Sequence, residues 1–249
     1  MRYFLHLAYQ GTNYSGWQRQ TTAISIQQVI EDSISKMLKE IVFIHGCGRT
    51  DAGVHASQYF AHIDIKRAID FNFVERINLV LPSDISIYEL IPVDEEFHAQ
   101  YDVSFRTYNY DFHIKKIPSK AEISAYYNIQ KLDLALINQA ILILKNTVDF
   151  RSLCKNPDLY KHTNCTIKKL EFKQLDENSF RLIITADRFL RGMIRYIIGR
   201  LLDIGTGKLS VEEFSSTLST RSEFGFRFQK QGFPQGLYLS KVEYPYLVR

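Results

Sequence analysis

The sequence predicts an α+β fold in which strand-like segments alternate with amphipathic helices. Over residues 2–88 the elements come in the order strand, helix, strand, strand, helix, strand, which is the order of the split-βαβ, or ferredoxin-like, fold. The 249 residues suffice for one large domain or two small ones, and 45% hydrophobic with 23% charged residues is usual for a soluble globular protein. The sheet of such a fold has an open face, which RNA-binding proteins use.

Hydrophobic periodicity defines each element of the first half. Apolar and polar side chains alternate over residues 2–10, as in a half-buried strand. Ser25 and Gln28 have capping-box spacing, so a helix begins there, and its apolar face continues to about Glu40. The β-branched and aromatic run at 41–45 predicts a buried strand. The other elements expected here are a strand at 57–65, a helix at 71–81 that Pro82 ends, and a strand at 85–88.

The second half also mixes strands and helices. Its strongest pattern is the apolar face of Leu190–Ile204, which predicts a helix. Residues 115–125 are mostly polar and include Pro118, so we interpret them as a linker or insertion. The remaining expected elements are strands at 105–113, 166–172, 180–186 and from 236, and helices at 133–144 and 211–218.

Net charge, cysteine count and the distribution of apolar residues limit the classes of function that the sequence suggests. The net charge of +4 is too small to indicate nucleic acid alone, but five arginines and one acid fall between Arg181 and Arg200. Such a basic surface suits a polyanion, although a solvated helix face has the same appearance. The three cysteines form no Cys-x-x-Cys pair, so neither a disulfide framework nor a cysteine zinc site is expected. No apolar run is long enough to span a membrane and no signal-peptide pattern is visible, so we expect a cytoplasmic protein.

The stretch Gly46–Ala56 connects two predicted strands and concentrates the residues suited to chemistry. Three glycines there let a ligand approach the main chain, and between them lie Arg49 and Asp51. A nearby cation can keep such a carboxylate ionised for use as a nucleophile. A structural turn with solvated Arg49 and Asp51 is the alternative. A phosphate-binding loop is disfavoured, because its glycine and lysine spacing is missing and a strand follows.

Two other features could contact RNA, and one arginine could reach a carboxylate. Trp17, in a polar loop at 11–20, could stack on a base, but we favour an anchor buried in the core. On the strand 105–113 the side chains Arg106, Tyr108, Tyr110 and Phe112 share one face, as either a stacking surface or an aromatic core. Arg195 lies beside the apolar stripe of its helix, where it could reach a carboxylate or remain in solvent.

The octapeptide Gly48–His55, Gly-Arg-Thr-Asp-Ala-Gly-Val-His, resembles the signature of the TruA-type tRNA pseudouridine synthases. Other segments resemble further motifs of that family in the same order along the chain. They are 9–20, Phe97-His98-Ala99 with Arg106-x-Tyr108-x-Tyr110, 149–152, 193–199 and 236–239. Departures are Gln10 where Asp is usual, Leu153 for an aromatic residue, and Gly232-Phe233-Pro234 for an Ala-Pro pair.

The resemblance implies an isomerase that converts uridine to pseudouridine at positions 38, 39 and 40 of the tRNA anticodon stem-loop, with no cofactor and no metal. It further implies that Asp51 starts the reaction as nucleophile or base, that Arg195 pairs with it, and that Tyr108 packs on the uracil. Arg49 would contact RNA. We favour Tyr110 and Phe112 as core residues, and His55 as a structural hydrogen-bonding group rather than an acid or base.

At the level of architecture the resemblance implies a homodimer. Each subunit would have two α/β halves flanking a central, positively charged cleft, with residues 1–103 carrying the Asp51 loop and 104–249 the Arg195 helix. Two other classes stay open. One is a catalytically inactive RNA-binding module, and the other is a carboxylate-dependent hydrolase, which would need a second carboxylate as general acid.

Overall fold

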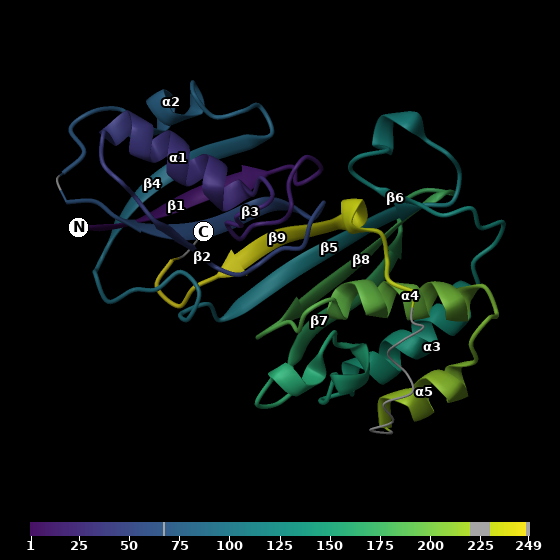
Figure 1. The fold of residues 1–249 in the computed structure, drawn as a ribbon. Helices are drawn as coiled ribbons and strands as arrows, with labels where there is room; N and C mark the ends of the chain where they lie inside the picture. The colour runs from purple at the N-terminus through teal and green to yellow at the C-terminus, as the bar shows by residue number, and fades with distance from the viewer. Residues whose placement is uncertain (67, 220–229, 248–249) are drawn as a thin grey trace. The chain divides into compact units, whose positions relative to one another are not determined.

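The computed structural model of the protein describes residues 1–66, 68–219 and 230–247. It has an α+β fold with mostly antiparallel strands, as predicted. The chain divides into two compact units, the first made of Met1–Arg106 with Tyr238–Arg249 and the second of Thr107–Leu237 (Figure 1). No helix in the described ranges combines the length and apolar character needed to cross a bilayer.

The first unit has the predicted order of elements. These are β1 (Arg2–Tyr9), α1 (Ile26–Leu38), β2 (Ile44–Gly46), β3 (His55–Asp64), α2 (Phe73–Asn78) and β4 (Ile85–Val93). β1 pairs antiparallel with β4 on one side and with β3 on the other, and β2 pairs with β3. The two helices lie on the same side of these strands (Figure 1). The returning strand β9 (Leu237–Glu243) adds a short parallel pairing, in which His55 is opposite Tyr238.

Local chemistry explains the bounds of α1 and corrects those of β2. The Ser25 side chain accepts a hydrogen bond from the Gln28 amide, and the helix ends at Lys39 in the left-handed conformation (φ 57°). The buried strand predicted at 41–45 is wrong in its first three residues. β2 begins at Ile44, and the Ile41 and Phe43 side chains are 83% and 67% exposed. Ile41 and Phe43 therefore precede the strand without entering the core, whereas Val42 between them is buried.

Among the described residues, the second unit contains three α-helices and the other strands. They are β5 (Phe105–His113), β6 (Ala125–Tyr126), α3 (Leu134–Lys145), β7 (Ile167–Gln174), β8 (Ser179–Ala186), α4 (Met193–Gly205) and α5 (Val211–Ser219). β8 lies between β5 and β7. Tyr110 and Phe112 are fully buried and Phe112 stacks on Phe180, so the prediction that they belong to the core is confirmed. Asp133 caps α3 by accepting two backbone hydrogen bonds, which confirms the predicted start of that helix.

A cluster of histidines lies against the sheet of the first unit. His62 on β3 is 2% exposed, stacks on His45 at 4.8 Å and meets the edge of the His98 ring at 4.5 Å. Its Nδ1 accepts a hydrogen bond from the Ala99 amide at 3.2 Å. Burial, reinforced by the charges of Arg2 and His98, lowers the pKa of His62 to about 4. The imidazole is therefore neutral in the folded protein at pH values where the unfolded chain is already protonated.

We expect this histidine to make stability fall on mild acidification. The pKa of His62 is lower in the folded state than the usual value of about 6.5, so the unfolded state binds the proton first. The stability contribution is complete above pH 6.5 and is lost as the pH falls toward 4. Between pH 7.5 and 5 the loss should be about 2 kcal/mol. His62→Asn keeps an acceptor for the Ala99 amide but cannot titrate. Urea denaturation at the two pH values should show a smaller loss in the variant, and equal losses would contradict the assignment.

Candidate active site

The loop between β2 and β3 presents Asp51 from a tight turn. The Val54 amide donates to the Asp51 carbonyl oxygen at 3.1 Å, and Gly53 adopts a φ of 75°, a value that favours glycine. The Asp51 side chain is half-buried, and that of Arg49 is exposed. The turn therefore holds a half-buried carboxylate two residues from an exposed cation.

A second loop, residues 10–17, holds this turn at three points. The Trp17 amide donates to the Thr50 carbonyl oxygen at 3.1 Å, and the Gly53 amide donates to the Tyr14 carbonyl oxygen at 3.3 Å. The Gly11 amide donates to Nδ1 of His55 at 2.9 Å. His55 is 1% exposed, so the prediction of a structural hydrogen-bonding role is confirmed. These bonds fix the backbone on both sides of Asp51.

Three aromatic side chains pack together and contact the turn through their hydroxyl groups or their main chain. The Trp17 ring stacks on Tyr59 with a centroid distance of 4.0 Å, and Tyr9 packs against both. The Tyr9 hydroxyl is hydrogen-bonded to Oγ1 of Thr50 at 2.8 Å, and the Tyr59 hydroxyl donates to the Gly48 carbonyl oxygen. Trp17 is 2% exposed, which confirms the predicted core anchor and removes this ring from the candidates for base stacking.

Arg49 and Cys47, which precede Asp51 in the loop, differ in burial and in the partners they contact. The guanidinium of Arg49 forms no hydrogen bond or ion pair with any residue that the structure describes. Cys47 is fully buried, and burial raises the pKa of its thiol to about 11, so it is not a nucleophile at neutral pH. The Arg106 guanidinium donates to the Cys47 carbonyl oxygen at 2.5 Å and to that of Gln100 at 3.0 Å. Arg106 thus supports the backbone of the loop, a role that its strand position did not indicate.

Tyr108 and Arg195 both belong to the second unit. Tyr108, on β5, is 8% exposed and meets the Phe189 ring edge-on at 5.0 Å. Arg195 is half-buried in the first turn of α4. Its Nε donates to the Gly232 carbonyl oxygen at 2.7 Å, while the Gly232 amide donates to the Arg195 carbonyl oxygen at 2.8 Å. Arg49 and Asp51, by contrast, share one loop of the first unit.

The five arginines of 181–200 do not form one uniform basic surface. Arg181 makes a bidentate ion pair with Asp111 at 2.6 and 2.7 Å. Arg200 lies 3.6 Å from Asp203. Arg188 contacts His162 and lies over the Tyr160 ring. Arg181 and Arg200 are therefore paired with carboxylates of the protein, and the positive charge available to a polyanion is smaller than the sequence suggested.

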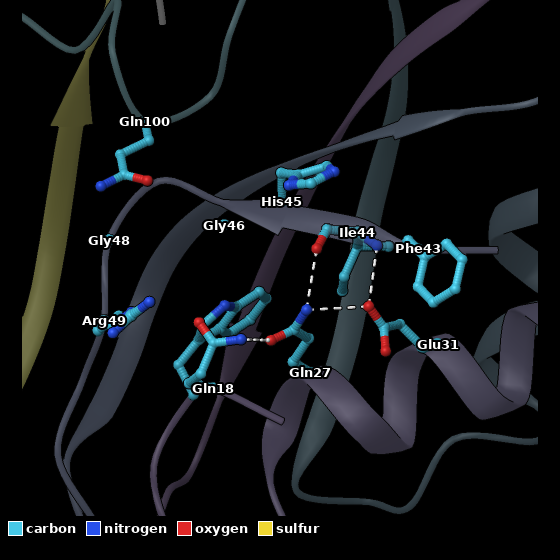
Figure 2. A pocket seen from close by; sticks show the side chains of 11 residues that line it. Gln18, Gln27, Glu31, Phe43, Ile44, His45, Gly46, Gly48, Arg49 and Gln100 are labelled. Carbon is cyan, nitrogen blue, oxygen red and sulfur yellow. Dashed lines mark hydrogen bonds between the residues drawn. The ribbon is translucent and has the colours of Figure 1, made fainter. Parts of the chain in front are cut away.

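The first unit also contains a cavity of about 460 Å³ beside Arg49 (Figure 2). Gln27 connects its wall, since it accepts from Gln18 at 2.8 Å and donates to Glu31 at 2.9 Å and to the Ile44 carbonyl oxygen at 3.1 Å. The full lining is Trp17, Gln18, Gln27, Glu31, Phe43, Ile44, His45, Gly46, Gly48, Arg49 and Gln100. No group of three or more His, Cys, Asp or Glu placed to hold a metal occurs in the described residues.

Comparison with known proteins adds an independent observation. Residues 144–245 match the family model described as tRNA pseudouridine synthase. The chain is 39% identical over 248 residues to tRNA pseudouridine synthase A of Porphyromonas gingivalis, covering 98% of this chain and 97% of that protein. It is 40% identical over 247 residues to the protein of the same name from Bacteroides fragilis, covering 98% and 96%. A Clostridium kluyveri protein of that name is 34% identical over 245 residues, covering 96% and 98%.

These matches identify the chain as a pseudouridine synthase, a class of isomerases. Identity above 30% extends over nearly the whole chain and nearly the whole length of its relatives. The chain belongs to the tRNA pseudouridine synthase A family.

Proposed function

We propose that the protein isomerises uridine to pseudouridine at positions 38, 39 and 40 in the anticodon stem-loop of tRNA. The observation that carries the proposal is the fixed presentation of Asp51 in a chain of this family. Its turn is held by backbone bonds to Trp17 and Tyr14 and by the bond from the Gly11 amide to the His55 side chain. The target base lies in a stacked stem, so it must be extruded, at a cost of a few kcal/mol.

The reaction is an isomerisation, so its balance needs no redox partner. The bond from uracil N1 to ribose C1′ breaks, a bond from C5 to C1′ forms, C5 loses a proton and N1 gains one. In this proposal Asp51 acts as the carboxylate that starts the reaction, whether at C1′, at uracil C6 or on a ribose proton. In this proposal Arg195 supplies the guanidinium that pairs with that carboxylate.

Two further residues are proposed to contact the substrate. Tyr108 would pack on the uracil, because a phenol ring stacks on a planar base. Arg49 would bind the RNA backbone or hold the extruded nucleotide, and its guanidinium has no partner among the described residues that would compete.

The architecture proposed for the working enzyme has three parts. It is a homodimer acting on tRNA in the cytoplasm. Each subunit has two ferredoxin-like halves, 1–103 and 104–249, flanking a positively charged cleft. The division and the dimer remain predictions. When the two-residue strand β6 and the helix α5 are set aside, the later part of the sequence has the order β5, α3, β7, β8, α4, β9. This is again the split-βαβ order, which supports the second half.

Tritium release from tRNA labelled at uracil C5 tests the function, because only loss of the C5 hydrogen releases the label. We expect release in proportion to added enzyme, from uridines at 38, 39 and 40 and from no other arm of the tRNA. The same reaction should yield no free uracil. Binding of tRNA with no release would indicate an inactive RNA-binding module instead, and free uracil would indicate a hydrolase.

A further inference from the structure

We propose that the cavity beside Arg49 is a second nucleotide site, which holds a nucleotide adjacent to the target uridine in the RNA strand. This inference rests on the proposed function, since it assumes that an RNA strand is bound along the Asp51 loop. The cavity lies entirely within the first unit, and it is lined by Gly46, Gly48 and Arg49 of that same loop. A strand that brings one base to Asp51 would therefore bring its neighbour to this cavity.

The cavity has the size of a ligand site. Its volume of about 460 Å³ falls in the range of roughly 300–1,000 Å³ usual for small-molecule pockets. A single phosphate or a water molecule would leave most of it unfilled. An organic ligand as large as a nucleotide fits the available space.

Charge distribution around the cavity suits a nucleotide with its phosphate at one end. In Figure 2 Arg49 lies on the left of the lining side chains and Phe43 on the right, with Gln18 and Gln27 between them. Glu31 is the one acidic residue of the lining, and its carboxylate is already used. It accepts from the Ile44 amide at 3.0 Å and from Arg19 at 3.1 Å, and its side chain is 2% exposed. Arg49 therefore dominates the field that an approaching phosphate meets.

The walls offer polar groups that suit the edge of a base. The side chains of Gln100 and His45 have no hydrogen bond to any described residue, and both are exposed. Gln18 uses its amide nitrogen on Gln27, while its oxygen has no partner in the described chain. Unstacked bases in RNA are recognised through such donors and acceptors on their Watson–Crick and Hoogsteen edges.

Phe43 supplies an aromatic surface at the cavity. Its ring is 67% exposed and pairs with no other aromatic ring in the described residues, although it lies next to the buried Ile44. An exposed phenylalanine at a polar wall has no evident structural role, whereas aromatic side chains commonly stack on single-stranded bases. The aromatic ring, the polar wall and the unpartnered guanidinium together favour a nucleotide over an apolar ligand.

The test compares Phe43→Ala and Phe43→Tyr in the tritium-release assay. Loss of one stacking contact should raise KM for tRNA about tenfold, with kcat unchanged within about twofold, because the contact contributes equally before and during the reaction. Phe43→Tyr keeps the ring and should behave as the wild type. Tyr88→Ala is the matched control, since Tyr88 is a 50% exposed aromatic on β4, the edge of this sheet away from β2. It should leave KM unchanged.

A photo-crosslinking amino acid at position 43 gives a second readout that does not depend on turnover. The crosslink should map to one of the two nucleotides that directly flank the target uridine, one on each side. A crosslink elsewhere in the tRNA, or an unchanged KM in Phe43→Ala, would overturn the proposal while tritium release by the wild type leaves the proposed function intact. A wild type without tritium release would refute the function, and the crosslink position would still decide whether this cavity binds RNA.

Discussion

Replacing Asp51 by asparagine is expected to lower tritium release from C5-labelled tRNA by at least about 10⁴-fold, because an amide cannot act as a carboxylate nucleophile or base. Asparagine has nearly the same shape as aspartate. The backbone bonds that hold this turn come from main-chain groups and from His55, so they remain available in the variant. The expected change is therefore in kcat, with tRNA affinity close to that of the wild type.

Asp70→Asn is the matched control for this experiment. Asp70 is an exposed aspartate of the same unit and has no partner among the described residues, so its conversion should leave turnover unchanged. Thermal denaturation of both variants should give midpoints close to that of the wild type. Substantial tritium release by a correctly folded Asp51→Asn variant would remove Asp51 from the mechanism.

Gly16→Ala is expected to cost both stability and activity. Gly16 has a φ of 89°, and a Cβ at this position would lie 2.4 Å from the Thr50 carbonyl oxygen and 3.1 Å from the Asp51 carbonyl carbon. The atoms that block the methyl group are backbone, so no side-chain rotation relieves the contact. Strain at the positive φ and displacement of the Asp51 turn together should destabilise the first unit by about 3 kcal/mol or more.

Gly207→Ala separates the two causes of that loss. Gly207 has a φ of 72°, but nothing lies within 4 Å of the position that its Cβ would occupy. This variant should lose only the backbone strain, about 1 kcal/mol, and keep full turnover. Urea denaturation and tritium release of both variants give the comparison. Equal destabilisation by the two substitutions would contradict the close contact between the loop of Gly16 and the Asp51 turn.

The features that the sequence predicted correctly depend on neighbours in the chain. The order of elements in the first unit follows from hydrophobic period, and the start of α1 follows from the spacing of Ser25 and Gln28. The Asp51 turn could be located because its glycines, its cation and its carboxylate are consecutive. The burial of Trp17 also agreed with prediction, since a lone large ring in a polar loop is most stable as an anchor.

The features that were missed depend on contacts between distant segments. Phe43 looked like a strand residue, yet only Ile44 onward pairs with β3, so the ring is left at the surface. Arg106 and Arg181 looked available for phosphate, but their partners, the Cys47 carbonyl oxygen and Asp111, lie 59 and 70 residues away along the chain. The cavity is lined by residues of α1, of β2 and of loops from separate parts of the first unit, and no local pattern indicates such a space.

The return of β9 to the first unit has a consequence for biosynthesis. Tyr238 pairs with His55, the residue at which the Asp51 turn enters β3. Farther along, the Val242 amide donates to the side-chain oxygen of Gln58 at 2.8 Å, and the Tyr244 hydroxyl donates to the Ala99 carbonyl oxygen at 2.6 Å. A ribosome must translate the whole of Thr107–Leu237 before these contacts can form. The nascent N-terminal unit is therefore incomplete until its last strand has been made, and the Asp51 turn gains these contacts only late in the synthesis of the chain.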